Sequence, residues 1–81
     1  MPQFLTSTVI SCLNRQDVEA LIKDLRAPSP QVKLDKAWGS TAEGKLICLF
    51  STGDRATLQQ FLKLKHVHTE WIVNVETEWN P

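Results

Sequence analysis

At 81 residues the chain suits a single small domain, spanning residues 1–81, which can bury only about 60 to 65% of the surface that its unfolded form exposes. Nine Lys and Arg residues balance nine Asp and Glu residues, so no net field draws the protein toward nucleic acid or anionic lipid. No stretch approaches the roughly 20 apolar residues that span a bilayer, and the first residues lack the features of a secretory signal. We therefore expect a cytoplasmic protein that binds neither nucleic acid nor membrane.

The first predicted unit is a strand followed by a helix. Residues 4–13 are rich in Val, Ile, Thr and Phe, which is the composition of a strand. Asn14 is suited to cap a helix, because Asp17 follows three residues later, where a carboxylate meets exposed backbone amides. The helix has one apolar stripe, made of Val18, Leu21, Ile22 and Leu25. Pro28 and Pro30 end it.

The second and third predicted strands differ in their patterns. Apolar and polar side chains alternate along residues 32–38, which indicates a strand with one solvent-exposed side. Residues 45–50 are apolar on both faces, so something must cover each side. One face carries Ile47 and Leu49, and the other carries Leu46, Cys48 and Phe50. We expect the latter set to look away from the helices, and we expect Cys48, like Cys12, to be a buried free thiol.

The second predicted unit repeats the first with a shift of forty residues. Asp54 caps a helix whose Leu58, Phe61 and Leu62 face the core, and a last strand covers about residues 69–77. Matched positions, in chain order, are Val9, Ile10, Asn14, Arg15, Val18, Leu21 and Ile22 with Leu49, Phe50, Asp54, Arg55, Leu58, Phe61 and Leu62. The shift places Ile72 on the inner face of the last strand, but Trp71, Val73 and Val75 form its more apolar side. The facing of this strand therefore stays open.

The element order is strand, helix, strand, strand, helix, strand, which is typical of the ferredoxin-like α+β fold. Right-handed crossovers put both helices on one face of a four-stranded antiparallel sheet. The other face of the sheet would be apolar and uncovered, which indicates an interface or a ligand groove. We therefore expect a homodimer or higher oligomer, in which two sheets pack face to face as a dimeric α+β barrel.

Two groups of side chains are candidates for a binding site. In an extended segment, His66, His68 and Glu70 would share one side, and two imidazoles with a carboxylate are ligand types for zinc or nickel. A solvated polar loop is the alternative. The second group is a pocket for an apolar small molecule, lined by the side chains of Trp38, Cys48, Phe50 and Trp71. Packing in the core or at a dimer interface is the alternative for these residues.

Catalysis and RNA binding have weaker support in the sequence. A cofactor-less monooxygenase would use His66, Asn74 and Trp71 as its base and pocket. This hypothesis rests on the analogy with other dimeric α+β barrels. RNA-binding domains share the strand order, but the third strand lacks their alternating aromatic residues. Phosphate-binding glycine loops and nucleophile elbows are also absent from the sequence.

Several segments resemble small, mostly uncharacterised bacterial ferredoxin-like families, including one with nickel-responsive members. The similar segments are Met1-Pro2-x-Phe4-Leu5, Asp17-Val18-Glu19-Ala20-Leu21, Trp38-x-Ser40, Gly44-Lys45-Leu46-Ile47-Cys48-Leu49-Phe50 with Asp54, and Ile72-Val73-x-Val75-Glu76. The resemblance implies a small dimeric α+β domain with a divalent transition metal near its last strand. It covers nearly the whole chain, but the segment 63–69 departs from the family pattern.

Three functions are thus expected, in this order. The first is a non-catalytic homodimeric binding module that holds an apolar small molecule or a protein partner on the open sheet face. The second is a divalent-metal protein that binds nickel or zinc through the His66 region. The third is a cofactor-less monooxygenase-like enzyme.

Overall fold

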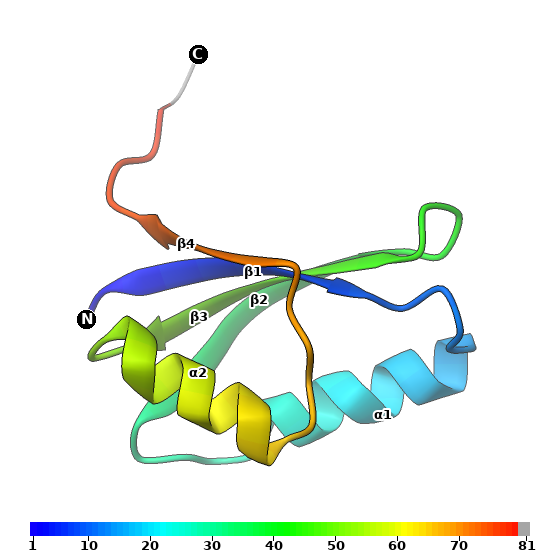
Figure 1. Ribbon diagram of the computed structural model, residues 1–81, viewed down its shortest axis with the longest axis horizontal. Helices are drawn as coiled ribbons and strands as arrows, with labels where there is room; N and C mark the ends of the chain where they lie inside the picture. Colours follow the sequence, from blue (N-terminus) through cyan, green and yellow to red (C-terminus); the bar gives the residue numbers. More distant parts are fainter. Residues whose placement is uncertain (80–81) are drawn as a thin grey trace.

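The computed structural model describes residues 1–79 and has six elements in the predicted order. Three of them make up the first half: β1 (Gln3–Val9), α1 (Arg15–Arg26) and β2 (Val32–Ser40). The second half contains β3 (Lys45–Thr52), α2 (Arg55–Leu64) and β4 (Trp71–Val75). Figure 1 shows both helices on one side of the sheet, and no helix or strand of residues 1–79 covers the other side. The expected ferredoxin-like α+β fold is therefore confirmed. No helix within residues 1–79 is both long and apolar enough to cross a membrane.

The sheet has the strand order β2-β3-β1-β4, with every neighbouring pair antiparallel. β1 pairs with β3 from Gln3↔Ser51 to Val9↔Lys45, and with β4 from Gln3↔Val75 to Ser7↔Trp71. β2 pairs with β3, and the register shifts by one residue at Asp35, between Leu34 and Lys36. This bulge lets Asp35 and Lys36 share the side of the sheet that faces away from the helices.

Both helices begin where the sequence predicts. The Asn14 side chain accepts a hydrogen bond from the Asp17 amide at 2.8 Å, and the Asp17 carboxylate accepts one from the Asn14 amide at 3.3 Å. The Asp54 carboxylate accepts a hydrogen bond from the Thr57 amide at 2.7 Å. Each cap satisfies backbone donors that a helix N-terminus leaves without partners. The hydrogen bond from the Thr57 amide, and then that from the Thr57 side chain, lower the pKa of Asp54 from its ordinary value.

The core lies between the sheet and the two helices, and it corrects the expected facing of β3. Leu46, Cys48 and Phe50 are buried in one cluster with helix residues, and the Phe50 ring meets the Phe61 ring edge-on at 6.2 Å. The expectation that this set looks away from the helices is therefore wrong. Since side chains alternate along a strand, Ile47 and Leu49 point to the uncovered side instead.

The ends of the first and last strands also differ from the sequence-based boundaries. β1 stops at Val9, because the chain turns at residues 10–13, where the Leu13 amide donates to the Ile10 carbonyl at 3.0 Å. Cys12 lies in this turn and is exposed, so its expected burial is wrong, whereas Cys48 is buried. β4 is shorter than predicted, and its Ile72 packs against the core. Of the two facings that the sequence left open for β4, the structure shows the one in which Ile72 is on the inner side.

Candidate functional site: the open sheet face

The uncovered side of the sheet, called the open face below, contains two rows of residues in register across the four strands. The first row is Trp38, Ile47, Ser7 and Trp71, and the second row is Lys36, Leu49, Leu5 and Val73. Neighbouring strands lie about 4.8 Å apart, so the two tryptophans of the first row are about 14 Å apart at their backbones. Three residues in each row are apolar; the exceptions are Ser7 in the first row and Lys36 at the end of the second.

Several of these side chains are far more exposed than large apolar groups in a core. Trp38 is 51% exposed, Trp71 is 42% exposed and Val73 is 50% exposed, while Leu5, Ile47 and Leu49 are half-buried. Scattered exposed apolar residues are ordinary, but a contiguous patch marks a contact surface. On the open face these side chains adjoin one another across neighbouring strands.

The expected ligand-binding residues divide between the two sides of the sheet. Trp38 and Trp71 lie on the open face, at its two edges. Cys48 and Phe50 are buried beneath the helices, with exposed fractions of 2% and 0%. The structure therefore does not bring the four residues into one pocket. Burial raises the pKa of the Cys48 thiol to about 11, and the hydrogen bond with Thr6 offsets only part of that rise.

A polar network lies at one end of the open face. The Ser7 hydroxyl donates to Glu70 Oε1 at 2.9 Å, and Lys45 Nζ donates to the same oxygen at 2.6 Å. The Glu70 amide also donates to the Ser7 carbonyl at 2.7 Å, which fixes the carboxylate just before β4. The hydrogen bond from Lys45, and then that from Ser7, lower the pKa of Glu70 from its ordinary value. Lys45 and Glu70 therefore form an ion pair at this end of the sheet.

A second polar group lies at the other end, around the β2 bulge. The Asp35 carboxylate accepts hydrogen bonds from the Ser51 hydroxyl and from Gln3 Nε2, the latter at 3.1 Å. Burial by itself raises the pKa of Asp35, but the hydrogen bonds from Ser51 and Gln3 and the charge of Lys33 outweigh it, so the pKa is lowered. The apolar rows thus lie between two polar ends.

The expected metal ligands are not gathered. His66 follows the end of α2 with a φ of 58°, so the segment does not run extended from His66 to Glu70 as the metal hypothesis required. Glu70 is engaged with Ser7 and Lys45 on the open face. Within residues 1–79 no three His, Cys, Asp or Glu side chains are close enough to hold a metal ion. The described residues therefore do not fit a nickel or zinc centre of the expected kind.

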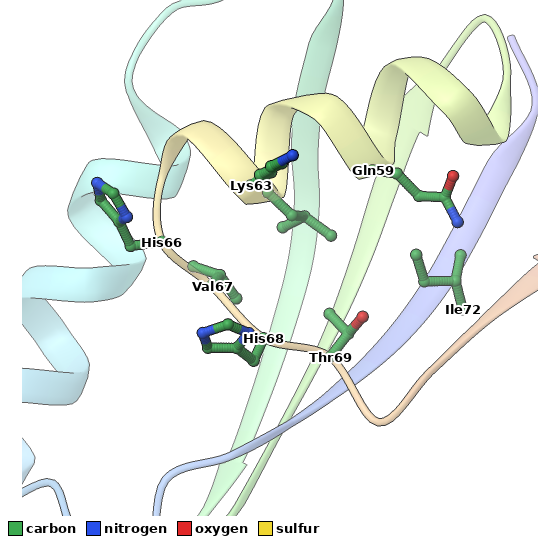
Figure 2. A pocket seen from close by; sticks show the side chains of 8 residues that line it. Gln59, Lys63, His66, Val67, His68, Thr69 and Ile72 are labelled. Carbon is green, nitrogen blue, oxygen red and sulfur yellow. The ribbon is translucent and has the colours of Figure 1, made fainter.

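His66 and His68 instead border a hollow between α2 and the loop that leads to β4. The hollow has a volume of about 490 Å³ and apolar walls from Leu62, Val67 and Ile72. Its other lining residues are polar, namely Gln59, Lys63, His66, His68 and Thr69. Figure 2 shows the two imidazoles on the side of the loop that faces α1, and Gln59, Thr69 and Ile72 on the opposite side.

The residues expected for oxygenase chemistry are also dispersed. His66 lines the hollow beside α2, whereas Trp71 belongs to the open face. Asn74 is exposed on β4, on the same side of that strand as Ile72. A general base must reach its substrate within hydrogen-bond distance, and this arrangement offers no common cavity for the three.

Sequence reasoning missed the central part of the open face, which is made by Leu5, Ser7, Ile47, Leu49 and Val73. The residues at the two ends of β3 contain a sequence signal for which of its sides faces solvent. The side of β3 that carries Ile47 and Leu49 begins with Lys45 and finishes with Ser51, so polar residues bracket it. That bracketing indicates the wetter side of a strand whose two faces are otherwise equally apolar.

Comparison with known proteins supports the fold. No family model matches the chain, and no curated protein matches it. The crystal structure of SCO4226 from Streptomyces coelicolor A3(2) is similar, with a TM-score of 0.83 and 15% sequence identity over 95% of this chain and 99% of that chain. At this level of identity the likeness shows a shared fold alone, because one fold serves many functions.

Proposed function

We propose that this chain is a non-catalytic binding module that works as a homodimer, with the open face as its interface. The observation that carries the proposal is the pair of mostly apolar rows, one from Trp38 to Trp71 and one from Lys36 to Val73, on a sheet side that neither α1 nor α2 covers. Monomeric proteins rarely leave a contiguous apolar patch of this kind in water. The chain is also short, so a partner would supply burial that the subunit lacks.

The chemistry of the open face suits a second copy of the same chain. In a twofold dimer the same patch serves both subunits, so its apolar rows would face apolar rows. The charges at one end of the open face, Lys45 and Glu70, already neutralise each other at 2.6 Å, and Lys36 lies at the outer edge of the second row. Burial of an unpaired charge is costly, and association would bury none at that end of the open face. The formal net charge of zero gives the two copies no long-range repulsion.

The same proposal includes a place for a small apolar ligand. Two sheets packed face to face enclose the space above Ile47 and Leu5, and Trp38 and Trp71 would form the side walls of that space. Aromatic walls around an apolar space with few polar groups are typical of ligand sites. Ser7 and Glu70 would be the polar groups nearest to such a ligand.

A pair of lysine substitutions tests the dimer. Val73→Lys places a charge on the open face, whereas Leu64→Lys places one on the exposed side of α2, where Leu64 is 70% exposed. Both positions are accessible in the subunit, so neither substitution should unfold it. We expect sedimentation velocity to show dimers for the unsubstituted protein and for Leu64→Lys, and monomers for Val73→Lys. A monomeric unsubstituted protein at about 100 μM, or a Val73→Lys dimer as tight as the original, would overturn the proposal.

A second candidate function is the binding of an amphipathic small molecule in the hollow beside α2. Its volume of about 490 Å³ falls in the range of ligand pockets, and Lys63 provides a cation among its lining residues. A suitable probe is 1-anilinonaphthalene-8-sulfonate, which has an aromatic body and one anionic group. We expect the Lys63→Ala variant to weaken probe binding, and Lys23→Ala on α1 to leave it unchanged. Equal fluorescence titrations for the two variants would remove this candidate.

A further inference from the structure

The segment from His66 to His68 borders a second hollow as well as the one beside α2. The second hollow has a volume of about 240 Å³ and lies between β1 and α1. Its walls are the segment itself and the side chains of Thr8, Val9, Leu13 and Leu21. Figure 2 shows both imidazoles on the side of the segment that faces α1, toward this second hollow. Residues 66–68 therefore line both hollows, and the two rows of the open face contribute to neither.

The backbone of this segment is fixed by the way in which α2 ends. The His66 amide donates to the Lys63 carbonyl at 3.1 Å, and the Val67 amide donates to the Leu62 carbonyl at 2.9 Å. With His66 in the left-handed conformation between them, at a φ of 58°, these two bonds form a Schellman motif. Val67 and Leu62 are both buried, which is the apolar contact that accompanies the motif. The buried Val67 leaves the imidazoles before and after it exposed to solvent.

His66 is an unusual residue for the position that it occupies. The left-handed residue of this motif is usually Gly and sometimes Asn, because a Cβ atom makes the conformation costly. Histidine is tolerated there, but the motif gains nothing from its side chain. Strained backbone positions cluster at ligand-binding sites. Since the His66 imidazole lines both hollows, a ligand contact accounts for a side chain at a position where glycine is more stable.

The polar groups that line the hollows favour an anion. Among residues 1–79, no Asp or Glu lines either hollow. Lys63 forms no ion pair within the same residues, whereas Lys65 pairs with Asp24 at 3.3 Å. Neither imidazole takes part in a side-chain hydrogen bond of the described chain. An ammonium group and imidazole N–H groups are the donors that bind a carboxylate.

The remaining walls favour an apolar body attached to that anion. Leu62, Val67 and Ile72 line the hollow beside α2, and Val9, Leu13 and Leu21 line the second one. Apolar walls with a few convergent polar groups are typical of small-molecule sites. The single full charge of Lys63 suits a monoanion better than a phosphate monoester, which carries nearly two charges.

We propose that the two hollows form one site for a small monocarboxylate with an apolar chain. Lys63 and the His66 imidazole bind the carboxylate, and the chain lies along Val67. This inference rests on the second candidate function above, for which it names the class of ligand. It does not depend on the homodimer, because the site shares no residue with the two rows of the open face.

Probes of similar chain length test the class of ligand. Octanoate is anionic, octanamide is neutral and octyltrimethylammonium is cationic. We expect octanoate to bind about tenfold more tightly than octanamide, because Lys63 and His66 donate charge-assisted hydrogen bonds to it. The cation should bind most weakly. Titrations followed by ¹H–¹⁵N nuclear magnetic resonance give the dissociation constants, and the amide signals of residues 66–69 should shift most with octanoate.

Two substitutions of His66 separate binding from stability. His66→Gly and His66→Ala both remove the imidazole, so each should weaken octanoate binding about tenfold. Glycine also relieves the left-handed conformation and alanine does not. The melting temperature should therefore rise by about 4 °C for His66→Gly and should not rise for His66→Ala. Gln60→Ala is the control, because Gln60 is exposed on α2 and lines neither hollow.

The outcomes distinguish the carboxylate site from the hollow as such. If octanoate binds no more tightly than octanamide, or if both His66 variants bind octanoate like the unsubstituted protein, the inference is wrong. It is also wrong if His66→Gly melts no higher than His66→Ala. In each of these cases, binding of 1-anilinonaphthalene-8-sulfonate that depends on Lys63 would still uphold the hollow beside α2 as a ligand pocket. If neither that probe nor octanoate binds, both proposals fall.

Discussion

Two neighbouring residues of β3 should lose different amounts of stability when they are truncated. Leu46 is 1% exposed beneath the helices, whereas Ile47 is half-buried on the open face. Leu46→Ala removes about three carbon groups from the core, worth about 2.4 kcal/mol of transfer, and the cavity left behind brings the loss to about 3–4 kcal/mol. For Ile47→Ala we expect about half of the transfer contribution, close to 1.2 kcal/mol, because no closed cavity forms.

The assay for this pair is urea unfolding followed by far-ultraviolet circular dichroism, at a protein concentration low enough for the subunits to be separate. With a slope of about 1 kcal/mol per molar urea, the midpoint should fall by about 3 M for Leu46→Ala and about 1 M for Ile47→Ala. Since a domain of this size has a total stability on the order of 4–12 kcal/mol, the first variant loses a large part of it. Sedimentation at higher concentration should show weaker dimerisation for Ile47→Ala.

The opposite result would refute the assignment of the two faces. If Ile47→Ala destabilises the separate subunit as much as Leu46→Ala does, Ile47 belongs to the core. If Ile47→Ala changes neither unfolding nor dimerisation, the open face is not an interface.

The remaining predictions concern acid, thiols and a turn. Hydrogen bonds from Lys45 and Ser7 hold the pKa of Glu70 below its usual range. As the pH falls, Glu70 is therefore protonated in the unfolded state before it is protonated in the folded state. Stability from this group should be complete above about pH 5 and fall as the pH drops through about 4.3 and below, and Glu70→Gln should flatten that decline in thermal melts. Mass spectrometry after treatment with iodoacetamide at neutral pH should find Cys12 modified and Cys48 protected, because Cys48 is buried and its pKa is about 11; modification of both would contradict this. Gly44 has a φ of 66° and an added Cβ would lie 2.8 Å from a neighbouring side chain, so Gly44→Ala should lower the free energy of unfolding by more than about 1 kcal/mol. Gly53→Ala meets nothing within 4 Å and is the control, expected to stay within about 0.5 kcal/mol.

The forty-residue repeat was sufficient to predict the order of elements and the helix caps, whereas it left the facing of Ile72 open. These features depend on local chemistry, such as the hydrogen bonds of Asn14 and Asp54, and on apolar spacing along a helix. Such signals are contained within a few neighbouring residues. They can therefore be recognised without any knowledge of the tertiary structure.

The facing of β3 and the grouping of the site residues could not be read in the same way. Both sides of β3 are apolar: one carries Leu46, Cys48 and Phe50, and the other carries Ile47 and Leu49. Alternation along the strand therefore does not show which side the helices cover. The histidine segment was misjudged because an extended backbone was assumed, whereas His66 takes a left-handed conformation at the end of α2. Both errors concern which distant elements meet, and the sequence pattern does not encode that directly.

The strand order has a consequence for how this chain is made. Each half contributes one central and one outer strand, and β1 bonds to β3 and β4, while β2 bonds to β3. Among the strands of residues 1–79, no ladder joins two strands of the same half. On the ribosome, the first forty residues therefore have no strand partner of their own and stay without a sheet until β3 has emerged. Splitting the gene at residue 40 should give two peptides that gain structure only when they are mixed.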